Sequence, residues 1–103
     1  MISFKKKIDK LKLQQNREIT ALITGASSGM GLLYATHLAE AGCNLLIVSN
    51  QEKELQEVAE NLHKDFNVAV TARYQDLSQD DAAQQLFDYC KKESIVIDIL
   101  INN

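Results

Sequence analysis

The segment Thr24–Gly31, which reads TGASSGMG, brings three glycines and three hydroxyl side chains together. The apolar run Ile19–Ile23 precedes it and a helical pattern follows it at once, as expected for a buried strand, a tight turn and a helix start. The first N–H groups of a helix have no partner inside the helix, and the helix dipole makes that end partly positive. Because glycine has no Cβ, an anion can approach such a turn closely. The segment therefore predicts a site for the diphosphate of a dinucleotide.

The spacing of the glycines distinguishes this segment from other phosphate-binding loops. A P-loop would place glycine, not Met30, five residues after Gly25, and the common G-x-G-x-x-G motif would place glycine at Tyr34. The motif that is present is T-G-x-x-x-G-x-G, formed by Thr24, Gly25, Gly29 and Gly31. This motif resembles the phosphate-binding loop of the short-chain dehydrogenase/reductase family.

The same residues also match the G-x-S-x-G nucleophile elbow of α/β hydrolases, with Ser27 as the nucleophile. Such a serine needs an acid and then a histidine later in the chain. His37 and His63 are the two histidines, and both fall in segments with helical patterns. A serine hydrolase is therefore the weaker alternative, beside a glycine turn that binds no ligand.

Two further segments resemble the same family. Asp76-Leu77 follows the third predicted strand, where the family places a carboxylate near the adenine edge, and Asn102-Asn103 resembles the start of its Asn-Asn-Ala-Gly motif. No metal site is expected. The resemblance implies that a nicotinamide dinucleotide is bound by Thr24, Gly25, Ser27, Ser28, Gly29, Met30, Gly31, Ser49, Asn50, Asp76, Leu77 and Asn102.

The residues after the second predicted strand bear on the choice of cofactor. An acid at this corner normally binds the adenosine ribose and selects NAD, but the first carboxylate here is Glu52, in the next helix. Ser49 and Asn50 can donate hydrogen bonds to a 2′-phosphate, although the arginine of many NADP-dependent members is absent. We therefore expect NADP(H) in preference to NAD(H).

The family resemblance also implies a catalytic tyrosine with a lysine four residues later. The residues four positions after Tyr34, Tyr74 and Tyr89 are leucine, serine and glutamate. The chain thus resembles the N-terminal, cofactor-binding half of an oxidoreductase that transfers hydride between carbonyls and alcohols, and we expect it to be inactive alone. A non-catalytic nucleotide-binding module that acts through a partner is the alternative.

The pattern of apolar residues predicts alternating strands and helices from residue 19 onward. The expected strands are 19–23, 45–48, 68–72 and 97–101, and the expected helices are 29–41, 52–66 and one from Ser78 or Asp80 to Ser94. Right-handed crossovers then give a parallel, doubly wound sheet of the Rossmann type with strand order 3-2-1-4, truncated after the fourth strand. Its unpaired edge predicts self-association. We expect a half-domain over residues 19–103.

Charge is distributed unevenly in this chain of 103 residues with a net charge of −3. Residues 1–18 form a basic N-terminal extension in which Phe4, Ile8 and Leu11 recur at helical spacing. Basic and aromatic residues do not cluster elsewhere, so no nucleic-acid partner is expected, and no apolar run could span a membrane. Cys43 and Cys90 have no metal-ligand spacing and are expected to be reduced thiols of a cytoplasmic protein.

Overall fold

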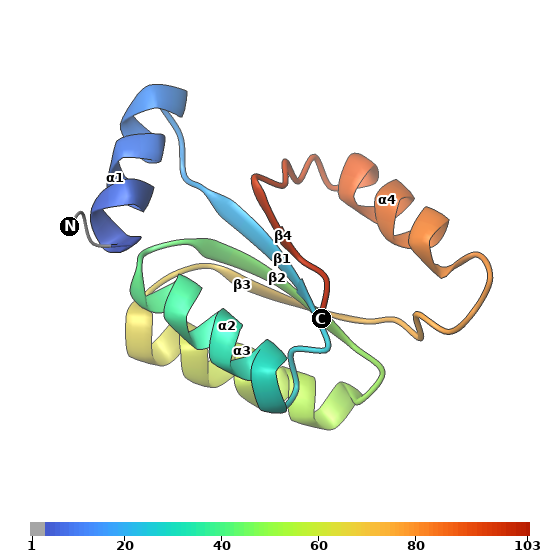
Figure 1. Cartoon of the computed structure of the whole chain (residues 1–103). Coiled ribbons are helices and arrows are strands. Elements are labelled where there is room, and N and C mark those ends of the chain that lie inside the picture. The colour runs from blue at the N-terminus through green and yellow to red at the C-terminus, as the bar shows by residue number, and fades with distance from the viewer. Residues whose placement is uncertain (1–3) are drawn as a thin grey trace.

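The computed structural model describes residues 4–103, a four-stranded parallel sheet with helices on both faces (Figure 1). The elements in chain order are α1 (Phe4–Gln15), β1 (Thr20–Thr24), α2 (Gly29–Glu40), β2 (Asn44–Ser49), α3 (Glu52–Phe66), β3 (Val70–Tyr74), α4 (Ala82–Lys92) and β4 (Ile99–Ile101). The strands lie in the order β3-β2-β1-β4, and every pair is parallel. The predicted Rossmann-type topology is confirmed.

Helix bounds agree with the sequence pattern where the chain carries a clear stop signal. Helix α3 has the predicted bounds and ends at Asn67, whose left-handed conformation (φ +55°) caps the helix. Gly42, with φ +95°, stops α2 as expected. Val68 is buried, but it lies in the connection that follows α3. Strand β3 begins at Val70, two residues later than the apolar pattern predicts. Burial alone therefore does not identify a strand.

The predicted start of the third Rossmann helix is wrong. Helix α4 begins at Ala82, because the residues before it form turns. The Asp76 carboxylate accepts hydrogen bonds from the Ser78 backbone N–H (3.0 Å) and from the Ser78 hydroxyl (2.6 Å). Ser78 is thus held in a turn by Asp76 and does not cap a helix.

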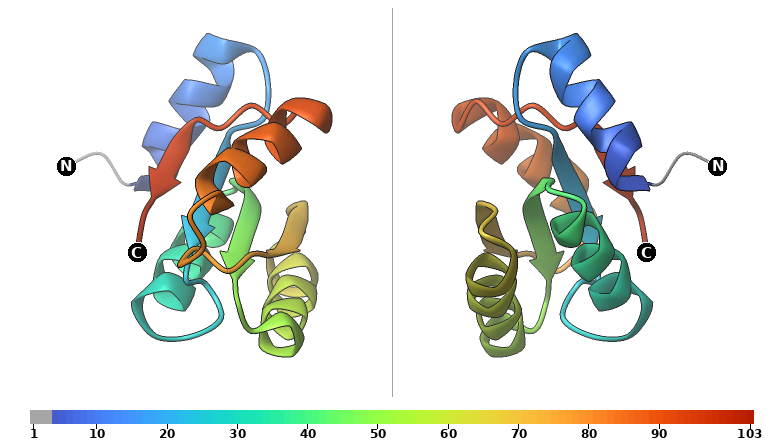
Figure 2. Two further views of the ribbon diagram at one scale, coloured as in Figure 1. Left: turned by 90° about the vertical axis from the view of Figure 1, so that its right-hand side faces the viewer. Right: turned by 90° about the vertical axis from the view of Figure 1, so that its left-hand side faces the viewer.

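The helices divide the core into two clusters on opposite faces of the sheet (Figures 1 and 2). Helices α2 and α3 lie side by side on one face, over a large buried cluster that includes Ile23 and Ile47. Helix α4 crosses the other face over a smaller cluster, whose buried members are Leu22, Leu46, Val48 and Leu86. Strands β1 and β2 at the centre of the sheet are apolar on both faces, as in other parallel sheets.

Helix α1 packs at the start of the sheet through one side of its apolar stripe. Ile8 is buried in the large cluster and Leu11 packs partly against it, whereas Phe4 is 45% exposed. No helix among residues 4–103 combines the length and apolar character that crossing a bilayer requires.

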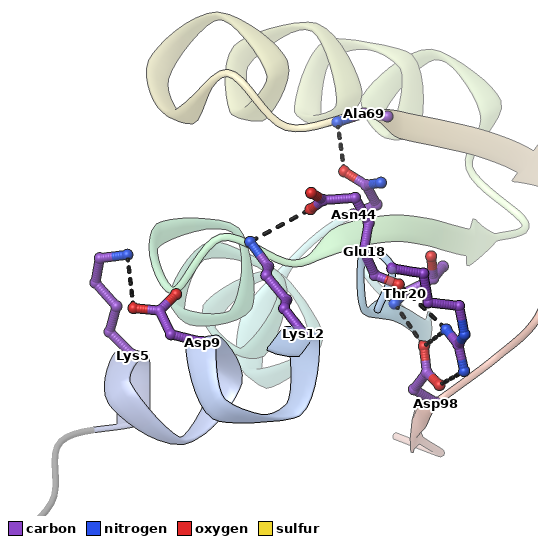
Figure 3. Close-up of polar contacts among 9 residues, drawn as sticks. Lys5, Asp9, Lys12, Glu18, Thr20, Asn44, Ala69 and Asp98 are labelled. Atoms are coloured by element: carbon purple, nitrogen blue, oxygen red, sulfur yellow. Dashed lines mark hydrogen bonds and ion pairs between the residues drawn. The ribbon is translucent and has the colours of Figure 1, made fainter. Parts of the chain in front are cut away.

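Beyond α1, the chain is tied to the last strand by an ion pair. The Arg17 guanidinium donates to both carboxylate oxygens of Asp98, and Asp98 also accepts a hydrogen bond from the Thr20 backbone N–H at 3.0 Å (Figure 3). The hydrogen bonds from Arg17 hold the pKa of Asp98 below its ordinary value. This contact fixes the N-terminal ends of β1 and β4 against each other.

Candidate nucleotide site

A polar cavity of about 370 Å³ lies at the carboxyl ends of the strands, between the loops that follow β1, β2 and β3. The predicted site residues that line it are Gly25, Ser27, Ser28, Ser49, Asn50, Asp76 and Leu77. Thus the structure brings three loops, far apart in the sequence, to one cavity. This is the edge at which ligands bind in open α/β sheets.

The glycine turn after β1 depends on two close contacts, one with a side chain and one with the backbone. Gly25 has φ +64°, a conformation that favours glycine, and a Cβ at this position would lie 2.8 Å from the side-chain amide nitrogen of Asn103. A Cβ at Gly31 would overlap the carbonyl oxygen of Gly25. Gly31 therefore allows α2 to pack directly against the turn, which is a structural role distinct from contact with a ligand.

The N-terminus of α2 is left open by this turn. Ser28 precedes the helix but makes no side-chain capping hydrogen bond, and the first backbone bond at this end is Leu32 N–H to Ser28 O (3.3 Å). The N–H groups of Gly29, Met30 and Gly31 therefore have no acceptor among residues 4–103. A Cβ built on Gly29 meets no atom within 4 Å. Space and unpaired donors thus fit a diphosphate at this end.

A chain of hydrogen bonds joins the glycine turn to the end of β2. The Gln51 backbone N–H donates to Ser49 Oγ (3.0 Å), the Ser49 hydroxyl donates to Ser27 Oγ (2.9 Å), and the Ser27 hydroxyl donates to Gln51 Oε1 (3.2 Å). The Asn50 side chain beside them makes no hydrogen bond within residues 4–103. This corner presents hydroxyl and amide groups to the cavity and no carboxylate.

The same contacts bear on the hydrolase alternative. The side-chain partners of Ser27 within residues 4–103 are Ser49 and Gln51. His63 lies in α3 with its Nδ1 2.8 Å from the Val68 carbonyl oxygen, and His37 lies near the C-terminal end of α2. The structure thus brings neither histidine to the serine.

Thr24 and Asn102 join strands and do not line the polar cavity. Thr24 is 5% exposed; its Oγ1 accepts a hydrogen bond from the Asn103 backbone N–H (3.0 Å), and its hydroxyl lies 3.3 Å from Asn102 Oδ1. Asn103 also donates from its side-chain amide to the Gly25 carbonyl oxygen at 3.4 Å. These bonds attach the end of β4 to the glycine turn. Thr24 and Asn102 instead line an apolar cavity of about 690 Å³ beneath α4.

The loop after β3 supplies the remaining side of the polar cavity. The Asp76 carboxylate accepts hydrogen bonds from Ser78 and, at 3.3 Å, from the Gln79 side-chain amide. The bonds from Ser78 are the main cause of its lowered pKa, so Asp76 is ionised at neutral pH. Leu77, the next residue, is exposed and lines both the polar cavity and the apolar one.

The cavity is also lined by residues that were not predicted as cofactor-binding residues. They are Gln51, Gln75, Ser78 and Asn103. Each lies within a few residues of the carboxyl end of a strand. This position in the sequence could have indicated that the residue lines the cavity. Residues 4–103 contain no group of three or more acidic, histidine or cysteine side chains that could hold a metal ion.

The sequence profile of the short chain dehydrogenase family matches residues 19–103. The chain belongs to this family. The match covers the sheet, the glycine turn and the helices that flank them, and it begins after α1.

Individual members of the short-chain dehydrogenase family are considerably longer than the region that matches this chain. It is 33% identical to the very-long-chain 3-oxoacyl-CoA reductase of Rattus norvegicus over 85 residues, which are 81% of this chain and 26% of that protein. The fatty acyl-CoA reductase of Acinetobacter baylyi is 35% identical over 98 residues, 95% of this chain and 33% of that protein. The chain therefore spans about a quarter to a third of the length of these relatives.

A solved structure agrees with the family assignment. The L-sorbose reductase of Gluconobacter frateurii, crystallised with NADPH and L-sorbose, superimposes with a TM-score of 0.78 at 31% identity. The superposition covers 84% of this chain and 33% of that one. The short-chain dehydrogenase fold is thus shared over the region that contains the polar cavity.

Proposed function

We propose that residues 19–103 form the NADP(H)-binding part of a short-chain oxidoreductase, preceded by a basic extension over residues 1–18. The observation that carries this proposal is the open N-terminus of α2, whose first N–H groups have no acceptor among residues 4–103 and directly follow Ser28 in the lining of the polar cavity. The related L-sorbose reductase was crystallised with NADPH, which supports the same class of ligand here. The complete protein would exchange hydride between the nicotinamide and a carbonyl or alcohol.

The contacts at the cavity support a proposed role for each strand end. The N–H groups of Gly29, Met30 and Gly31 would bind the diphosphate, with Gly25 shaping the turn and Ser28 beside it. The Asn50 amide would donate hydrogen bonds to the ribose 2′-phosphate. The Ser27 and Ser49 hydroxyls, which donate to Gln51 Oε1 and to Ser27 Oγ, would turn from these acceptors to reach the same group. Asp76 and Leu77 would border the adenine, and Thr24 and Asn102 would hold the strands that carry the site.

The choice between cofactors can be tested at Asn50. We expect wild-type protein to bind NADPH about tenfold more tightly than NADH in calorimetric titration, a difference of about 1.4 kcal/mol. Asn50→Asp should reverse this order, because a carboxylate repels the 2′-phosphate and accepts hydrogen bonds from a ribose hydroxyl. Asn61→Asp, on the exposed side of α3, is the matched control for added charge. Equal affinity of the Asn50 variant for both dinucleotides would contradict the proposal.

Catalysis is assigned to the complete protein because this chain contains no Tyr-x-x-x-Lys sequence. We expect the 103-residue chain to bind NADPH without oxidising it when a carbonyl substrate is added. Loss of NADPH absorbance with matching alcohol formation would contradict this. The missing motif equally favours a second candidate, a nucleotide-binding module that acts through a partner.

The edge of β4 suggests self-association of the 103-residue chain. Strand β4 pairs with β1 on one side, and Leu100 is 61% exposed. An apolar strand edge of this kind pairs readily with another chain. Sedimentation should show dimers or larger species at micromolar concentration, and Leu100→Lys should reduce them. A tight monomer in the wild type would refute the proposal.

A further inference from the structure

Helix α1 carries a concentration of positive charge. Five of its twelve residues are lysines, and Asp9 is its one acidic residue. The whole chain has a net charge of −3, so the remainder of the molecule is acidic. A basic element on an acidic protein turns toward anionic partners, because the rest of the surface repels the same partners.

Burial determines which side of α1 faces outward. Ile8 is 2% exposed in the large cluster, and Leu11 packs partly against that cluster. With 3.6 residues per turn, positions 6, 10 and 13 fall on the side of the helix opposite Ile8. Lys10 is exposed on this side, and Leu13 is 83% exposed. The exposed residues of this side form the outer face of α1, which consists of Lys6, Lys7, Lys10 and Leu13.

Two of the five lysines are paired with acidic side chains. These ion pairs join Lys5 to Asp9 at 3.6 Å and Lys12 to Glu18 at 3.3 Å (Figure 3). Lys7 and Lys10 are exposed and form no ion pair within residues 4–103. The outer face of α1 therefore keeps positive charge that no carboxylate in the described part of the chain compensates.

The outer face of α1 lies away from the proposed nucleotide site. Figure 1 shows α1 beside the N-terminal ends of the strands, whereas the polar cavity lies at their carboxyl ends. A partner bound to α1 would thus leave the cavity accessible. Helix α1 also precedes the segment that the family profile matches, so membership of the family does not by itself account for its lysines.

We propose that the outer face of α1 binds the surface of a membrane that contains anionic lipids. Lysine side chains attract anionic headgroups, and an exposed apolar side chain enters the boundary between the headgroups and the acyl chains. A nucleic acid would also attract the lysines, but it would leave Leu13 in water. The combination of Lys7, Lys10 and Leu13 therefore favours a lipid surface. The contact is peripheral and does not depend on the proposed dinucleotide function.

Co-sedimentation of the 103-residue chain with lipid vesicles tests this proposal. We expect binding to vesicles of phosphatidylcholine with phosphatidylserine, little binding to phosphatidylcholine alone, and release when the salt concentration rises from about 0.1 M to about 0.5 M. Lys7→Gln/Lys10→Gln should weaken binding about 25-fold, because each lysine near an anionic surface contributes a factor of about five. Leu13→Ser, which keeps the charge, should weaken binding at least about threefold.

The matched control removes two lysines from another helix. Lys53 and Lys64 in α3 are exposed and form no ion pair within the residues that the structure describes. Lys53→Gln/Lys64→Gln should therefore bind the vesicles like the wild type. All the altered side chains are exposed, so the far-UV circular dichroism of every variant should match that of the wild type.

Three outcomes would overturn the proposal. The first is equal binding of the wild type to both kinds of vesicle. The second is an equal loss of binding in the two double variants, because net charge and not the outer face of α1 would then determine affinity. The third is binding to single-stranded RNA in the absence of binding to vesicles, which would assign the outer face of α1 to a nucleic acid.

Discussion

The two faces of the sheet differ sharply in how well they are packed. On the face of α2 and α3 the buried cluster extends from Ile8 in α1 to Val68 before β3. The buried cluster under α4 has four members, and Phe87 and Leu100 beside it are 62% and 61% exposed. An apolar cavity of about 690 Å³ lies on this second face.

This difference in packing bears on where the proposed nucleotide site lies. The face of α2 and α3 supports the glycine turn and the end of β2, so the residues that build the proposed nucleotide site stand on the better-packed side. The face of α4 leaves Phe87 and Leu100 exposed beside an apolar cavity, and a contiguous apolar surface is normally covered by further chain or by a partner.

The largest effect should come from a cavity in the well-packed cluster. Ile47→Ala removes a fully buried side chain of β2, and we expect it to lower the free energy of unfolding by about 3–5 kcal/mol. Leu86→Ala, in α4 beside the existing cavity, should cost about 2 kcal/mol because less packing is lost. Urea denaturation measures both. Equal losses would remove the distinction between the faces.

Gly31→Ala should disturb the site on the well-packed side. Its Cβ would overlap the Gly25 carbonyl oxygen, so the turn must shift, at a cost of about 1–3 kcal/mol. NADPH binding should fall below detection in calorimetric titration. Gly29→Ala is the comparison variant: its Cβ meets no protein atom but would enter the space assigned to the diphosphate, so it should weaken NADPH binding without displacing Gly25, and its left-handed backbone costs about 1–2 kcal/mol. If both variants bound NADPH like the wild type, close packing of the turn would be unimportant.

A smaller effect is expected where the last strand is attached. The pKa of Asp98 is lowered by Arg17, so the contact stabilises the fold above the ordinary aspartate pKa of about 3.9. This stabilisation should disappear as the pH falls through the lowered value. Urea midpoints of wild type and Asp98→Asn should therefore differ at pH 6 and converge toward pH 2. A difference in urea midpoint that stays constant with pH would show that the charge of Asp98 does not contribute to stability.

The reactivity of the two cysteines allows the packing of the two faces to be compared in the wild-type chain, without a substitution. Cys43 is fully buried in the large cluster, where burial raises the pKa of its thiol to about 11. Cys90 packs partly against the smaller cluster, and burial raises its pKa as well. A thiol reagent at pH 8 should label Cys90 first and Cys43 only after unfolding. Faster labelling of Cys43 would mean that the large cluster opens locally.

Much of the fold was predictable because local signals agreed with one another. The apolar spacing in α3 and the stop at Gly42 gave helix ends, and the alternation of strands and helices gave the parallel order. The start of α4 was not predictable in this way. Several acceptable capping residues precede it, and the contact between Asp76 and Ser78 decides among them.

The candidate site was predictable in its backbone and less so in its side chains. The glycine spacing located the open end of α2. The environment of Gln75 depends on Gln85 and Asp81, which α4 brings close only in the folded chain. Gln51 similarly acquires a role through Ser27, on the loop after β1, and Ser49, at the end of β2. A single sequence does not reveal which polar residues a fold brings into contact.

The attachment of β4 also has a consequence for the order of folding. Strand β1 pairs with β2 across one helix, whereas the bond between Thr20 and Asp98 joins residues 78 positions apart. Contacts between distant parts of a chain form slowly, so β4 should dock last. The Asn103 amide reaches Gly25 only when β4 is in place. Among residues 4–103, the glycine turn would therefore gain its contacts with Asn103 only after β1, β2 and β3 have come together.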